Sequence, residues 1–181
     1  MKRLFFPGML AIAALLFFTS ETATAQKFPP LDKSPMDIAS FPARGSNKAI
    51  KVVYSRPQKK GRDILGGLEA FGKVWRTGAN EATEITFYQN TTLGGKAIKA
   101  GTYSLFTIPE KDKWTIILNS GLNEWGAYEY KESEDVLRYE VPVQKTASTV
   151  EVFSIVFEKT DNGANMILAW DNTMVSVPFV F

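Results

Sequence analysis

Apolar and polar residues alternate with a period of two along most of this chain. Ile50, Val52 and Tyr54 occupy every second position, and so do Ile85 and Phe87. A period of two places successive side chains on opposite faces of a strand, whereas an amphipathic helix needs a period near 3.6. The alternation therefore limits the fold to one that is built mainly from strands.

Further short runs have the same strand-like composition, at 102–108, 114–119, 136–143, 150–158, 165–170 and 174–181. The turns at 93–96, 109–112 and 160–163 are typical of hairpins, which join antiparallel neighbours. The sequence therefore predicts an all-β fold: a single antiparallel β-sandwich, jelly-roll or immunoglobulin-like in general architecture, with about 8–10 strands. Very little helix is expected, and the one candidate is a short stretch at 63–71 whose apolar residues share a face.

The composition divides the chain into three parts. Residues 1–25 have the features of a secretory signal: a basic start, an apolar run and small residues before a cleavage site after Ala25. Residues 26–48 contain four prolines and few periodic apolar positions, which predicts an extended arm. Residues 49–181 form the predicted sandwich domain. We therefore expect an exported protein that is periplasmic or secreted.

The charge balance argues against two classes of partner. Loss of Lys2, Arg3 and Glu21 with the signal lowers the formal net charge from +2 to +1. Such a chain lacks the concentrated positive field that favours nucleic acid or an anionic membrane. No segment after the signal is long and apolar enough for membrane insertion. We expect no nucleic-acid partner and no membrane insertion after cleavage of the signal, and the oligomeric state stays open.

The chain contains no histidine and no cysteine. The usual zinc ligands, the thiolate nucleophile and the commonest general base are therefore missing. No spaced Asp/Asn loop of the calcium-binding helix–loop–helix type occurs either. We predict no metal site and no cofactor.

The densest group of polar side chains lies in the stretch WRTGANEAT at 75–83. Further arginines precede it at 54–63, and a tyrosine follows it at 101–106. If these loops meet at one end of the sandwich, they form a polar ligand site whose predicted residues are Arg56, Arg62, Arg76, Thr77, Asn80, Glu81 and Tyr103. Guanidinium groups, amides and hydroxyls suit a small polar or anionic ligand, and aromatic rings beside amides and carboxylates suit a carbohydrate. The stretch 125–128, WGAY, is the best candidate for an exposed aromatic platform.

Each of these residues also has a structural explanation that needs no ligand. Arg76 can pair with Glu81 or stack on Trp75, because structural ion pairs also gather in such loops. Asn80 can cap backbone groups. Gly78 is explained by a positive φ or by a close backbone approach.

Five longer stretches resemble a known family. They are VVYSRP (52–57), KGRDI (60–64), VWRTGANEAT (74–83), KAGTYSLFTIP (99–109) and WTIILN (114–119). They are similar to domain-of-unknown-function family 2911, and the resemblance covers nearly the whole mature chain from about Ser34. It implies an exported, largely bacterial protein with a β-rich domain and no assigned activity. It also implies that the polar stretches are family hallmarks, which favours the loop cluster as the place for a site.

Three functions remain open. The first, which we favour, is the binding of a small polar or anionic ligand or of a carbohydrate. The second is a carboxylate-based hydrolase acting on glycans, with Glu81 and Glu84 as candidates and Asp63 as a more distant third. Residues three apart on a strand point to opposite faces, so this pair requires Glu81 to lie in the loop. The third is a structural or assembly role in the cell envelope. Because no histidine is available, we rank binding above catalysis.

Overall fold

The computed structural model describes residues 25–181, so the predicted signal lies almost entirely outside the described residues. Leu31–Phe181 form a unit of their own, and the fold described below is the fold of this unit. Among residues 25–181, no helix is both long and apolar enough to cross a bilayer.

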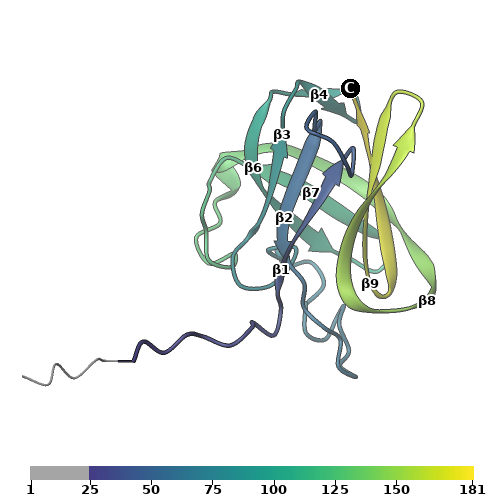
Figure 1. Cartoon of the computed structure of the whole chain (residues 1–181). Coiled ribbons are helices and arrows are strands. Elements are labelled where there is room, and N and C mark those ends of the chain that lie inside the picture. The colour runs from purple at the N-terminus through teal and green to yellow at the C-terminus, as the bar shows by residue number, and fades with distance from the viewer. Residues whose placement is uncertain (1–24) are drawn as a thin grey trace, which may run out of the picture. The chain divides into compact units, whose positions relative to one another are not determined.

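Nine strands make up the fold: β1 (Met36–Phe41), β2 (Ile50–Ser55), β3 (Thr83–Phe87), β4 (Thr91–Leu93), β5 (Lys96–Ile98), β6 (Gly101–Pro109), β7 (Lys113–Asn119), β8 (Asp135–Thr160) and β9 (Gly163–Val180). A single 3₁₀ turn, η1 (Glu132–Glu134), is the only helical element in the described part of the chain. The strands form one antiparallel sheet in the order β1-β2-β3-β6-β7-β8-β9-β4-β5 (Figure 1). The predicted all-β, antiparallel class is confirmed, and all three predicted hairpin turns occur.

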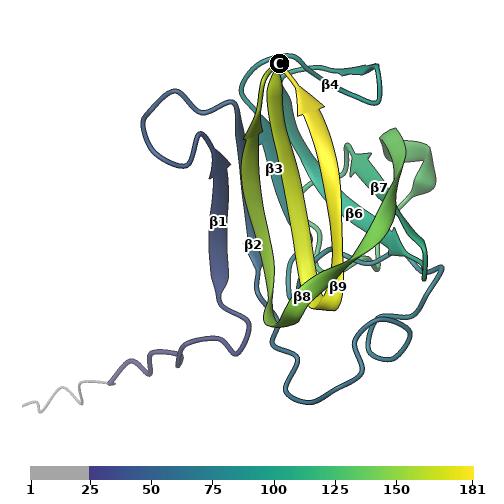
Figure 2. The same cartoon turned by 90° about the vertical axis from the view of Figure 1, so that its right-hand side faces the viewer.

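Strand β8 lets one sheet form two layers. Residues 135–142 pair with β7, whereas residues 143–160 pair with β9. The register with β9 shifts between Lys145 and Val150 and again between Val150 and Ser154, and such irregularities bend a strand. Figure 2 shows the β8–β9 hairpin lying across the layer that contains β2, β3 and β6. The fold is therefore sandwich-like, and the separate runs predicted within 136–158 belong to one strand.

The alternating residues of both layers meet in one main core. Phe87 of β3 contacts Phe179 of β9 with ring centroids 5.2 Å apart, and Tyr54 of β2 contacts Phe153 of β8 at 5.8 Å. A smaller cluster, centred on Ala82, Phe106 and Ile117, lies on the opposite face of β6 and β7. Since these two strands are buried on both faces, the loops before β3 and before β8 must cover their second face.

The prediction of a short helix at 63–71 is wrong. The segment forms turns in which Leu65 pairs with Glu69. Gly66 has a φ of +85°, a left-handed conformation that interrupts a helix and that glycine adopts at little cost.

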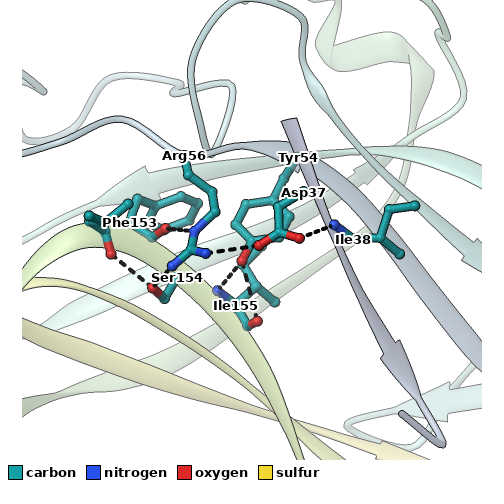
Figure 3. Close-up of polar contacts among 8 residues, drawn as sticks. Asp37, Ile38, Tyr54, Arg56, Phe153, Ser154 and Ile155 are labelled. Atoms are coloured by element: carbon teal, nitrogen blue, oxygen red, sulfur yellow. Dashed lines mark hydrogen bonds and ion pairs between the residues drawn. The ribbon is translucent and has the colours of Figure 1, made fainter. Parts of the chain in front are cut away.

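Polar side chains join β2 to β8 beside the edge strand β1 (Figure 3). The two strands are not neighbours in the sheet, so no backbone ladder joins them. The Tyr54 hydroxyl accepts a hydrogen bond from the Ile155 N–H at 3.0 Å and donates to the Ile155 carbonyl at 3.4 Å. The Arg56 Nε–H donates to the Phe153 carbonyl at 3.1 Å, and Arg56 Nη1 forms an ion pair with Asp37 at 2.9 Å. These side chains satisfy strand groups that a neighbouring strand would otherwise satisfy.

Replacement of Tyr54 by Phe tests this connection. The change leaves the buried Ile155 N–H without an acceptor, which costs about 1–3 kcal/mol of unfolding free energy. Chemical denaturation of Tyr54→Phe and of the matched control Tyr88→Phe measures the difference. Tyr88 is 51% exposed, so its variant is expected within about 0.5 kcal/mol of the wild type. Equal stabilities of the two variants would contradict the role given to the Tyr54 hydroxyl.

Candidate functional site

Trp75 anchors the long loop between β2 and β3. Its backbone N–H donates to the Thr107 carbonyl at 2.7 Å, and its carbonyl accepts from the Thr107 N–H at 3.0 Å. The indole lies in the main core, with its ring 5.9 Å from both Trp170 and Trp114. The indole N–H donates to the Gly78 carbonyl at 3.1 Å. The residues that follow Trp75 are therefore held against the sheet.

The next turn is held equally firmly. Thr77 is fully buried and has a φ of +56°, an unusual conformation for a β-branched residue. The Thr77 hydroxyl lies 3.1 Å from that of Thr107, and the Thr83 hydroxyl donates to the Thr77 carbonyl at 2.7 Å. A Cβ on Gly78 would lie 3.0 Å from the Ser55 carbonyl oxygen. Gly78 is therefore explained by close backbone approach.

A second loop, between β7 and β8, joins the first. The Gly126 N–H donates to the Asn80 carbonyl at 3.0 Å, and the Ala82 N–H donates to the carbonyl of Glu124 at 2.9 Å. Between these two bonds, Glu81 and Trp125 form an isolated bridge. The pairing places the indole of Trp125, which is 61% exposed, beside the exposed Glu81.

Two adjoining cavities open around Glu81, with volumes of about 240 Å³ and about 300 Å³. Both are lined by Met36, Ser55 and Glu81, and together we call them the Glu81 hollow. The first is also lined by Val53, Tyr54, Ala82, Glu84 and Asn123, and the second by Asp32, Ser34, Asn80 and Trp125.

The Glu81 hollow is acidic. Its lining includes the carboxylates of Asp32, Glu81 and Glu84 and contains no lysine or arginine. Hydrogen bonds from the Ser34 N–H and the Asn80 amide lower the pKa of Asp32 and so favour its charged form. The hollow thus presents hydrogen-bond acceptors next to one exposed aromatic ring.

Two residues of the lining have strained backbones. Asn80 and Asn123 both have a φ of +60°, in the left-handed region that asparagine tolerates better than most residues. Strained conformations persist where the surrounding structure holds them, and they cluster at functional sites. Asn123 lines the first cavity and Asn80 the second, and this supports the Glu81 hollow as the candidate site.

The structure does not bring the three predicted arginines together. Arg56 lies in the β2–β8 connection, bonded to Asp37 as described above. Arg62 is exposed and donates to the carbonyl of Lys59 at 3.0 Å. The Nε of Arg76 is buried and has no hydrogen-bond partner in the described part of the chain. None of the three lines the Glu81 hollow.

The other predicted residues divide between the hollow and the framework. Asn80, Glu81 and Glu84 line the hollow, and the Asn123 N–H donates to Glu84 Oε1 at 3.2 Å. Thr77 does not line the hollow; it is buried and joins the loop to β6 through its hydroxyl contact with Thr107. Tyr103 does not line the hollow, and its hydroxyl donates to the carbonyl of Lys99 at 3.0 Å.

Several lining residues were not predicted. Asp32, Ser34 and Met36 belong to the segment expected to be an extended arm, and Met36 begins the edge strand β1. Asn123 comes from the loop that carries the predicted aromatic platform. Its position two residues before Trp125 is the one sequence signal that could have identified it.

A larger cavity of about 460 Å³ lies between β1 and β8. Most of its lining residues are apolar, and Lys159 is the only charged residue among them. Binding sites usually combine apolar surface with a few convergent polar groups. We therefore favour the Glu81 hollow, where such groups converge.

The comparisons with known proteins support the resemblance seen in the motifs. The model of a family described as "Protein of unknown function (DUF2911)" matches residues 34–179. The match covers β1 through nearly all of β9 and includes every residue that lines the Glu81 hollow except Asp32. No curated protein and no solved structure matches the chain.

A partly buried carboxyl group lies near two of the predicted arginines. Burial raises the pKa of Glu69 to about 7, and the positive charges of Arg76 and Arg62 partly oppose this rise. The folded state therefore binds the Glu69 proton more tightly than the unfolded state does. This contribution to stability is fully present below the unfolded pKa near 4.5 and is lost as the pH rises through about 7.

Replacement of Glu69 by Gln tests this linkage. We expect the unfolding free energy of the wild type to fall by about 1–2 kcal/mol more between pH 5 and pH 8 than that of Glu69→Gln, after allowance for solvent screening. Urea denaturation at several pH values measures both slopes. Identical slopes for the two proteins would show that Glu69 does not titrate in this range.

Proposed function

Since this chain belongs to the family described as "Protein of unknown function (DUF2911)", we propose its function from the geometry of the site: it is an exported domain that binds a neutral carbohydrate in the Glu81 hollow. The observation that carries the proposal is the pairing of Glu81 with the exposed Trp125. A sugar presents hydroxyl groups along its edge and C–H groups on its face. A carboxylate beside an indole matches both, because the carboxylate accepts hydrogen bonds and the ring provides apolar surface.

The remaining lining supports the same ligand class. The lining also includes Asn80, Asn123, Ser34 and Ser55, whose side chains end in amides and hydroxyls. Amides and hydroxyls both donate and accept, so they can meet hydroxyl groups in several orientations. Met36 adds an exposed apolar side chain at the point where the two cavities join. The combination suits a polyhydroxyl ligand with an apolar face.

The acidity of the hollow disfavours an anionic ligand. The earlier expectation of anion binding depended on converging guanidinium groups, and these groups lie outside the lining. A carboxylate or phosphate on the ligand would meet Glu81, Glu84 and Asp32, and like charges brought together at a binding site weaken association. We therefore restrict the proposal to neutral sugars.

The proposed location rests on residues 1–25. Their basic start, apolar run and small residues near Ala25 are features of a secretory signal. The absence of histidine and cysteine is compatible with a domain that relies on packing alone outside the cytoplasm.

Titration of the protein with neutral and anionic sugars tests the proposal. We expect neutral mono- or oligosaccharides to raise the melting temperature and to change tryptophan fluorescence, while uronic acids and sugar phosphates have no effect. Trp125→Ala and Glu81→Gln should each weaken binding at least about 10-fold, because each removes about 1.4 kcal/mol or more of contact energy.

The matched controls are Tyr88→Ala and Glu140→Gln, which change an exposed aromatic residue and an exposed glutamate outside the hollow. Both should bind like the wild type. Binding that survives in Trp125→Ala and Glu81→Gln would place the ligand elsewhere. A complete lack of sugar binding would reject the proposal and favour an assembly role.

Glycan hydrolysis is the second candidate, because Glu81 and Glu84 line the same 240 Å³ cavity. Glu81 lies in the loop before β3 and not on the strand itself, so the two carboxylates need not point to opposite faces of a strand. Hydrolysis also needs one carboxyl group that stays protonated, which usually requires an apolar environment. Glu81 is exposed and Glu84 already accepts a hydrogen bond from Asn123, so neither has that environment.

We accordingly expect no cleavage of any sugar that the protein binds. Incubation for a day followed by chromatography of the products measures this. Release of shorter sugars by the wild type but not by Glu81→Gln or Glu84→Gln would instead establish the hydrolase.

A further inference from the structure

Three side-chain oxygens converge above Gly121, in the loop between β7 and β8. Glu124 Oε1, Glu134 Oε2 and Asn119 Oδ1 all lie within 3.1 Å of the position that a Cβ on Gly121 would occupy. The three residues are separated by up to 15 positions in the sequence, and the loop closes around Gly121 to bring them together. Two of the three groups are carboxylates, so the arrangement concentrates negative charge.

Glu124 is the unusual member of this group. The residue is only 8% exposed, and its Oε2 is buried without a hydrogen-bond partner in the part of the chain that the structure describes. Burial raises the pKa of Glu124, the charges of Glu134 and Glu129 raise it further, and Lys131 has the opposite effect. A buried carboxylate without a partner is costly, and a bound cation would offset that cost.

The neighbouring hydrogen bonds fix the orientation of the other two donors. The Asn119 amide nitrogen donates to the Lys131 carbonyl at 3.0 Å and to Asp135 Oδ1 at 2.8 Å. The Asn119 amide oxygen accepts from the Gly121 N–H at 2.8 Å, which turns it toward Gly121 and leaves its second lone pair for an ion. Glu134 Oε1 pairs with Lys131 Nζ at 3.0 Å. The second oxygen, Glu134 Oε2, is thereby directed toward Gly121 and Glu124.

We propose that Glu124, Glu134 and Asn119 bind a calcium ion above Gly121. All the donors are oxygens, which hard cations prefer, and Ca²⁺ accepts six to eight oxygens in flexible geometry. Water and backbone carbonyl groups would complete the coordination. The sequence-based expectation of no metal site rested on the missing histidine and cysteine and on the lack of a known calcium-loop pattern. Within residues 25–181, no group of three or more acidic, histidine or cysteine side chains is placed to hold a metal ion. The proposed site consists instead of two carboxylates and one amide.

The ion would also hold the loop that shapes the Glu81 hollow. Asn123 and Trp125, which flank Glu124, line the hollow. The Glu124 carbonyl accepts from the Ala82 N–H at 2.9 Å, next to Glu81. The calcium proposal stands independently of the sugar, because its tests below measure the ion alone.

Thermal unfolding of the whole protein, first in EDTA and then with CaCl₂ up to about 10 mM, tests the site. We expect calcium to raise the melting temperature by about 5 °C, because the ion binds only the folded state. Terbium luminescence excited through tryptophan gives a direct second readout, since Trp125 is adjacent to Glu124. Magnesium should have a smaller effect, because it requires near-octahedral geometry with short bonds.

Two variants should abolish both signals. Glu124→Gln removes the buried charge, and in EDTA its melting temperature should equal or exceed that of the wild type. Gly121→Ala places a methyl group where the oxygens converge. That methyl meets only the ends of side chains, so the variant should fold. Glu132→Gln is the matched control, because Glu132 is an exposed glutamate in the same segment that pairs with Arg138. It should respond like the wild type.

Several results would overturn the calcium site. An unchanged melting temperature in CaCl₂ together with a more stable Glu124→Gln would mean that Glu124 holds a proton in place of an ion. A calcium response that persists in Glu124→Gln and Gly121→Ala would place the ion elsewhere. A magnesium response equal to or larger than that of calcium would reject the assignment to calcium.

Discussion

The indole of Trp75 connects the loops of this protein to its core. The ring stacks on Trp170 of β9 with an interplanar angle of 17°, and it contacts Trp114 of β7 and Phe153 of β8 edge-on. It therefore touches both layers of the folded sheet. Aromatic rings bury large apolar areas, so the position of Trp75 is strongly determined. Since Glu81 follows six residues later in a braced turn, the geometry of the Glu81 hollow depends on this packing.

The polar residues at the end of β2 and in the long loop after it serve two separate purposes. Arg56 and Tyr54 complete the hydrogen bonding of β8 where no strand covers it. Asn80 and Glu81 line the hollow, where their polar groups stay accessible. The division follows from position. The first pair lies at the end of β2 and faces the backbone of β8, whereas the second lies beyond the Trp75 anchor and meets the loop that carries Trp125.

The sequence allowed a part of the candidate site to be predicted. The density of polar residues at 75–83 indicated Asn80 and Glu81, and the WGAY stretch indicated the aromatic platform. The grouping of the three arginines failed for a physical reason. Residue type shows that a guanidinium group needs acceptors, but it does not show whether a ligand or the protein's own carbonyl groups supply them. Arg56 and Arg62 both use backbone carbonyls.

The sequence by itself determined the strand-rich character of residues 49–181, the hairpin turns and the antiparallel class, because alternation and turn chemistry act over a few neighbouring residues. It did not identify β1, which lies in the segment expected to be an extended arm. Only the tertiary structure decided that β8 would serve both layers, that Met36 would reach Glu81, and that Glu124 would face Glu134 across Gly121. These contacts join residues far apart in the chain. Their geometry is set by how the core packs as a whole, and no local pattern encodes it.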